Sequence, residues 1–165
     1  MATRTLELEP ESVRALYLVG SAAERTGRFE RAAEAFKRLL DLEPDYAPAL
    51  NYLGYLWAER GENLETARQL IEKAVALEPD NGAYVDSLGW VYFQLGRYPE
   101  ARRHLQWAAK LLPEDATVWE HLGDLSVKMG EIEPARAAYR KAIEVGADDP
   151  DKLQAKLQEL AATAP

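Results

Sequence analysis

Small and large apolar residues recur along the chain with a period close to 34 residues. The clearest mark is a glycine within an apolar stretch, whose successive copies are 34, 35 and 34 residues apart. This first set comprises Gly20, Gly54, Gly89 and Gly123. A second glycine follows each of them after seven residues, at Gly27, Gly61, Gly96 and Gly130. A period of this length predicts stacked helical hairpins.

Each repeat continues with an alanine and then a large apolar residue. The alanines are Ala32, Ala67, Ala101 and Ala135. The large residues are Phe36, Ile71, Leu105 and Tyr139. In the second repeat the alanine follows its glycine by six residues instead of five, so one extra residue is expected in the turn near residues 62–64. Pro44, Pro79 and Pro113 close the first three repeats, because proline lacks the N–H that would continue a helix.

The two glycines of a repeat are expected to have different structural roles. The first lies in the middle of a helix, where it costs about 1 kcal/mol relative to alanine and is tolerated if another helix approaches closely. The second ends that helix, where a positive φ is cheap only for a residue without a Cβ. We therefore predict an all-α chain of eight repeat helices, two in each repeat, followed by one further helix and without any sheet.

The two ends of the chain differ in pattern. Residues 1–12 contain Leu6 and Leu8 in a stretch that parallels the ends of later repeats, so we expect the tail of a truncated preceding repeat. The alternative is a natural N-terminal arm. Residues 150–165 predict a capping helix, since Leu153, Leu157 and Leu160 form one apolar stripe. The alternative for this helix is a detachable segment that binds a partner.

Composition narrows the classes of function. Apolar residues make up 47% of the chain, which is typical of a folded protein. The formal net charge of the chain is -8, and this negative charge disfavours nucleic acid and anionic membrane surfaces as partners. No apolar run approaches the roughly 20 residues of a membrane helix. Without cysteine, disulfides and thiolate chemistry are excluded. The expected compartment is the cytoplasm if Met1 is the natural start, or the cell envelope if the chain is cut from a longer exported one.

Three segments resemble the tetratricopeptide repeat. They are Asn51-Tyr52-Leu53-Gly54, Asp86-Ser87-Leu88-Gly89-Trp90 and Glu120-His121-Leu122-Gly123-Asp124. The resemblance places four repeats at 13–46, 47–81, 82–115 and 116–149. It implies a right-handed α-α superhelical solenoid and a non-catalytic scaffold that binds a protein or peptide in a concave groove. The variety among the repeats resembles bacterial arrays near the C-terminal end of longer chains, so we expect an adaptor in a bacterial assembly or quality-control complex.

The resemblance also assigns the groove to the first helix of each repeat. The groove positions hold Tyr17, Asn51, Tyr52, Tyr55, Glu59, Asp86, Trp90, Phe93, Glu120, His121 and Asp124. Trp57 and Tyr92 occupy an inward position and are expected in the core. The groove is therefore aromatic and mildly acidic, and we expect a partner with apolar anchors and a basic residue. The alternative function is structural, in which the array stacks on itself through an uncapped N-terminal end or on the rest of a longer chain.

Catalytic and metal-binding chemistry finds little support in the sequence. His121 and Asp124 are three residues apart on one helix and are expected to touch, but a metal site needs more converging ligands. Ser87, Asp86 and His121 do not form a catalytic triad, because Ser87 and His121 hold equivalent positions of adjacent repeats, whose helices lie about 8–10 Å apart. The glycines belong to helices and turns, and no phosphate-binding loop is present. We predict no enzyme activity, no cofactor and no metal.

Overall fold

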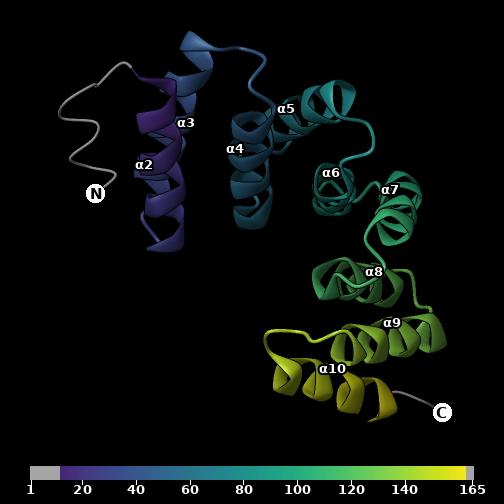
Figure 1. Ribbon diagram of the computed structural model, residues 1–165. Helices are drawn as coiled ribbons and strands as arrows, with labels where there is room; N and C mark the ends of the chain where they lie inside the picture. Colours follow the sequence, from purple (N-terminus) through teal and green to yellow (C-terminus); the bar gives the residue numbers. More distant parts are fainter. Residues whose placement is uncertain (1–11, 163–165) are drawn as a thin grey trace. The chain divides into compact units, whose positions relative to one another are not determined.

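The computed structural model describes residues 12–162, and this part of the chain consists of nine α-helices and their connecting turns (Figure 1). The helices are α2 (Val13–Arg25), α3 (Phe29–Leu42), α4 (Ala47–Arg60), α5 (Leu64–Leu77), α6 (Gly82–Gln94), α7 (Tyr98–Leu111), α8 (Ala116–Lys128), α9 (Ile132–Glu144) and α10 (Pro150–Ala162). The chain divides into two compact units, Met1–Pro79 with α2 to α5 and Asp80–Pro165 with α6 to α10.

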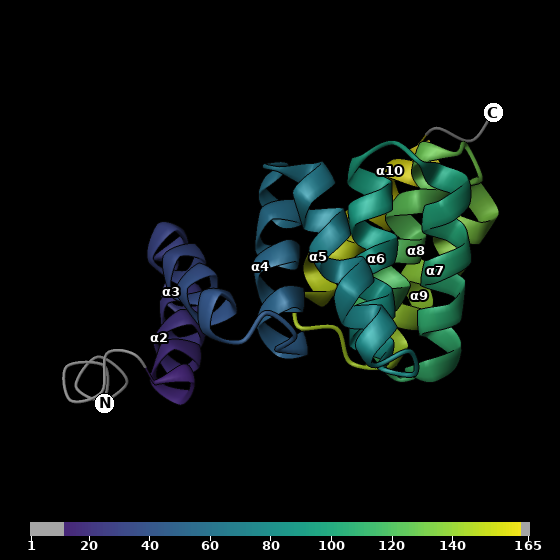
Figure 2. The same ribbon diagram turned by 90° about the horizontal axis from the view of Figure 1, so that it is seen from above.

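Within each unit the helices pack as consecutive hairpins. In the first unit α2 pairs with α3 and α4 pairs with α5, and α3 packs against α4. In the second unit α6 pairs with α7 and α8 with α9, α7 packs against α8, and α10 lies beside α9 (Figure 2). The predicted all-α fold of paired helices with a final capping helix is confirmed for the described residues. The predicted tail of a preceding repeat, with Leu6 and Leu8, lies outside them.

The turns between paired helices follow the glycine pattern. Gly61 ends α4 with a φ of 66°, and Gly130 follows α8 with a φ of 74°, so both adopt the left-handed conformation that favours glycine. The extra residue of the second turn is accommodated by Asn63, which also has a positive φ, of 46°, and directly precedes α5. Asparagine tolerates this conformation better than most residues. The predicted helix ends and the longer second turn are therefore confirmed.

The mid-helix glycines allow the two helices of a hairpin to approach closely. A Cβ built on Gly123 in α8 would lie 2.3 Å from Cε1 of Tyr139 in α9. A Cβ on Gly54 in α4 would lie 2.5 Å from Cγ1 of Ile71 and 2.9 Å from the carbonyl oxygen of Ala67 in α5. Real Cβ atoms do not come so close to other heavy atoms. The glycine and the large apolar residue of each repeat are therefore partners in one contact.

The capping helix completes the core of the second unit. Leu153 and Leu160 of α10 are buried against Ala135, Tyr139 and Ala142 of α9, and Leu157 is partly buried in the same cluster. The predicted leucine stripe thus covers the last hairpin. The two predicted core aromatics are also buried: Trp57 is 8% exposed and Tyr92 is 7% exposed.

Candidate functional site

The predicted groove residues lie on the first helices of the hairpins, α2 and α4 in the first unit and α6 and α8 in the second. Those of the first unit build on an aromatic cluster, defined here as Tyr17, Phe36, Tyr46 and Tyr52. Tyr52 stacks on Phe36 with ring centroids 5.4 Å apart and meets Tyr17 edge-on at 5.9 Å. The Tyr52 residue is 37% exposed, and burial followed by the neighbouring Tyr17 raises the pKa of its hydroxyl.

The remaining predicted residues of the first unit flank this cluster on α4. Asn51 and Tyr55 are half-buried and Glu59 is exposed. The side-chain oxygen of Asn51 is buried without a hydrogen-bond partner among the described residues. Among its predicted groove residues, the first unit therefore presents partly exposed aromatic rings together with the exposed carboxylate of Glu59.

In the second unit three rings form one stack. Trp90 lies 4.7 Å from Phe93 and 4.1 Å from His121, centroid to centroid, with interplanar angles of 14° and 17°. Phe93 and Trp90 come from α6, and His121 comes from α8. The indole nitrogen of Trp90 is buried and has no hydrogen-bond acceptor among the residues that the structure describes. We call this arrangement the Trp90 stack.

His121 is held by Asp86 and not by Asp124, the neighbour expected from the sequence. Nδ1 of His121 lies 3.0 Å from each carboxylate oxygen of Asp86, and both side chains are more than nine-tenths buried. The two side chains reach toward each other between α6 and α8, so the pair forms although it belongs to different hairpins. The hydroxyl of Ser87 donates to the Ala83 carbonyl at 2.9 Å and is engaged within its own helix.

Asp124 and Glu120 are bound by the capping helix. Nζ of Lys156 in α10 lies 2.6 Å from Asp124 and 2.9 Å from Glu120, and Nζ of Lys152 lies 2.7 Å from Glu120. Burial raises the pKa of Glu120, but the hydrogen bonds from Lys152 and Lys156 outweigh it and lower the pKa overall. The hydroxyl of Tyr139 also donates to Asp124 at 2.6 Å, and burial with this bond raises the tyrosine pKa.

A pocket with a volume of about 360 Å³ lies at the end of this network. We call it the C-terminal pocket. Its lining is Phe93, Asp124, Val127, Lys128, Tyr139, Lys156, Glu159 and Leu160. Val127 is 39% exposed, and Phe93 links the pocket to the Trp90 stack. Aromatic and aliphatic surface beside a few charged groups is the usual composition of a binding pocket.

Sequence reasoning missed two parts of this surface. The ion pairs between α8 and α10 had a signal in the sequence. Glu120 and Asp124 are four residues apart and so are Lys152 and Lys156, so each pair lies on one face of its helix and the two faces can form ion pairs. The C-terminal pocket had no signal in the sequence, since its lining comes from four helices.

In the described part of the chain no group of three ligating side chains converges as a metal site would require. Within that part, no helix is both long and apolar enough to span a bilayer.

Comparison with known proteins gives both a family and a set of similar structures. Residues 1–47, 20–82 and 87–152 match the tetratricopeptide repeat. No curated protein matches the sequence. The thermophilic tetratricopeptide-repeat protein TTC0263 of Thermus thermophilus is 25% identical, with a TM-score of 0.80 over 98% of this chain and 87% of that one.

Two further structures share the fold at lower identity. PilW, described as a widely conserved type IV pilus biogenesis factor, is 19% identical, with a TM-score of 0.83 over 99% of this chain and 76% of its own. MamA from Desulfovibrio magneticus RS-1 is 24% identical, with a TM-score of 0.75 over 87% of this chain and 81% of its own. The chain belongs to the tetratricopeptide-repeat family, whose members generally serve as protein-interaction scaffolds and not as enzymes.

Proposed function

We propose that this scaffold binds a peptide or helix of a partner protein on the first helices of its hairpins, through partly exposed aromatic rings. In the first unit the contacts are assigned to Tyr17, Asn51, Tyr52, Tyr55 and Glu59. In the second unit they are assigned to Trp90 and Phe93 of the Trp90 stack and to the C-terminal pocket. Aromatic side chains carry much of the binding energy of protein interfaces, often about 2 kcal/mol or more each.

The observation that carries this proposal is the C-terminal pocket beside Phe93. It offers about 360 Å³ of space next to Val127, an exposed apolar side chain. An apolar anchor of the partner would be desolvated there against Phe93 and Val127. The stacking of Phe93 on Trp90 fixes the ring in advance, which lowers the entropy lost on binding.

The ion pairs of the groove suggest how the partner's charge is selected. Of the acidic groove residues, Asp86 is paired with His121, and Glu120 and Asp124 are paired with lysines of α10. Glu59 in the first unit and Glu159 at the C-terminal pocket make no ion pair among the described residues. These two carboxylates, together with the formal net charge of -8, favour a partner with a basic residue near its apolar anchor.

Selection from a random peptide library tests this proposal. Peptides that bind the full chain are expected to share a large apolar residue with a lysine or arginine close by. Their affinity should fall about thirtyfold for the double variant Phe93→Ala with Val127→Glu, because an anchor contact worth about 2 kcal/mol is lost. Fluorescence anisotropy of labelled peptides measures the change.

Ala137→Glu is the matched control. It introduces the same charge at an exposed position of α9 that does not line the C-terminal pocket. This variant should bind the selected peptides as the original chain does. Equal affinity for the original chain and the Phe93/Val127 variant would contradict the proposal.

A further inference from the structure

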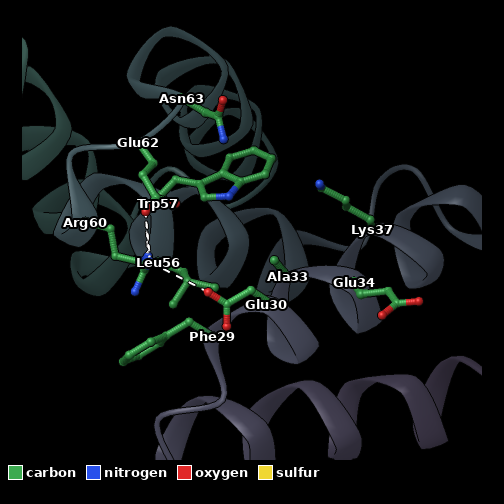
Figure 3. A pocket seen from close by; sticks show the side chains of 10 residues that line it. All are labelled: Phe29, Glu30, Ala33, Glu34, Lys37, Leu56, Trp57, Arg60, Glu62 and Asn63. Atoms are coloured by element: carbon green, nitrogen blue, oxygen red, sulfur yellow. Dashed lines mark hydrogen bonds and ion pairs between the residues drawn. The ribbon is translucent and has the colours of Figure 1, made fainter.

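A second pocket lies in the first unit, away from the aromatic cluster. It has a volume of about 340 Å³ and lies between α3 and the end of α4 (Figure 3). We call it the side pocket. Its lining is Phe29, Glu30, Ala33, Glu34, Lys37, Leu56, Trp57, Arg60, Glu62 and Asn63. The apolar part of this lining comes from Phe29, Ala33, Leu56 and Trp57.

Both aromatic rings of the side pocket already attract cations. Nζ of Lys37 lies 5.2 Å from the centroid of the Trp57 ring, and the guanidinium of Arg60 lies 4.9 Å from that of Phe29. The face of an aromatic ring attracts a cation electrostatically, and tryptophan does so best. The chain's own Lys37 and Arg60 therefore already lie over these rings, and against these two cations the lining holds three carboxylates, those of Glu30, Glu34 and Glu62.

The side pocket owes its space to a departure from the repeat pattern at Ala33. The residue that follows the repeated alanine is an arginine in the other three repeats, at Arg68, Arg102 and Arg136. In the second unit Arg102 reaches the next hairpin, where its guanidinium lies 2.6 Å from Glu131 and 2.9 Å from the sulfur of Met129. Glu131 and Met129 hold the repeat positions of Glu62 and Arg60, which line the side pocket.

The ion pairs around the side pocket leave the carboxylate of Glu34 without a cationic partner among the described residues. Arg60 lies 2.9 Å from Glu62 and 3.8 Å from Glu30, so its charge is balanced within the chain (Figure 3). Glu34 makes no ion pair among the described residues. The side chain of Glu30 is 87% exposed and only loosely engaged by Arg60. Glu30 and Glu34 lie one helical turn apart on α3, and both line the pocket.

We infer that the side pocket binds an arginine side chain of a partner protein, in the space that an arginine of the chain itself occupies in the repeat of Arg102. Ala33 leaves space for the side chain, Trp57 supplies the ring face over which Nζ of Lys37 now lies, and Glu30 and Glu34 accept hydrogen bonds from the guanidinium. Arginine suits this site better than lysine, because its planar guanidinium stacks on a ring and pairs with carboxylates at once. The site uses α3 and the end of α4, so it is independent of the proposed peptide-binding surface.

Two short probes test this assignment on the full chain. N-acetyl-leucyl-arginine amide carries the guanidinium, and N-acetyl-leucyl-citrulline amide has nearly the same shape without the charge. Titration is followed by NMR through the indole N–H resonance of Trp57. The arginine probe should shift this resonance saturably and bind about tenfold more tightly than the citrulline probe. Equal shifts from the two probes would overturn the inference.

Variants separate the side pocket from other acidic surface. Ala33→Arg restores the residue type of the other repeats, should fill the pocket, and should abolish the shift of Trp57 by the arginine probe. Glu34→Gln should weaken the probe about threefold. Arg102→Ala, the matched control in the second unit, leaves the side pocket intact and should not change the titration. Binding that persists in a folded Ala33→Arg variant, judged by unchanged helicity, contradicts the assignment.

Discussion

Replacing His121 with phenylalanine is expected to lower the free energy of unfolding by about 3 kcal/mol, because it leaves a buried carboxylate without its partner. The carboxylate belongs to Asp86, and each of its oxygens lies 3.0 Å from Nδ1 of His121. Phenylalanine retains a flat ring for stacking on Trp90, so most of the loss comes from the broken pair. Chemical denaturation followed by circular dichroism measures the change.

The double variant Asp86→Leu with His121→Phe provides the control. Removing both partners avoids the buried, unpaired charge, and well-packed apolar replacements of an ion pair are often neutral or stabilising. This variant should therefore recover most of the lost stability. A small loss of stability in His121→Phe combined with a large loss of peptide binding would instead make His121 a direct contact for the partner.

Replacing Gly123 with alanine is expected to destabilise the chain by about 2 kcal/mol. The added Cβ would lie 2.3 Å and 2.4 Å from ring atoms of Tyr139, which is buried to 2% exposure. Overpacking of a core costs about 1–3 kcal/mol, and moving the ring also weakens its 2.6 Å hydrogen bond to Asp124. The better helix propensity of alanine offsets about 1 kcal/mol of this loss in the free energy of unfolding.

A second substitution identifies the clash as the cause. Tyr139→Ala removes the ring atoms that a Cβ at position 123 would meet, whereas a leucine there would still clash, as Leu105 would with a Cβ on Gly89. Gly123→Ala should therefore cost much less in the Tyr139→Ala background than in the original chain, and a thermodynamic cycle of the four proteins measures the difference. An equal cost in both backgrounds would show that contact with Tyr139 is not the cause.

The fold was predictable from local sequence because its signals recur. The period of the glycines located the hairpins. The offset of six residues from Gly61 to Ala67, against five in the other repeats, indicated the longer turn that contains Asn63. Each signal acts within one helix or one turn. The stripe of Leu153, Leu157 and Leu160 likewise reports one face of one helix, and that face is the one packed on α9.

The details of the candidate site were less predictable because they depend on contacts between hairpins. Asp86 and His121 are 35 residues apart, and helix periodicity favoured the nearer Asp124 as the histidine's neighbour. The tyrosine and lysine partners of Asp124 come from two later helices. The side pocket depends on the absence of one arginine, which becomes visible only when Arg102 is seen to cross to the next hairpin.

The most direct test of the proposed binding surface is an NMR titration of the full chain with a selected peptide, followed through the indole resonances of its four tryptophans. Trp90 lies in the ring stack next to Phe93, and its indole nitrogen has no acceptor among the described residues. Trp107 is 45% exposed on α7, and the indole of Trp119 donates to the Pro113 carbonyl at 2.8 Å. Binding at the proposed surface predicts that the Trp90 resonance shifts saturably while those of Trp107 and Trp119 stay in place. A shift of Trp107 with an unchanged Trp90 would contradict it.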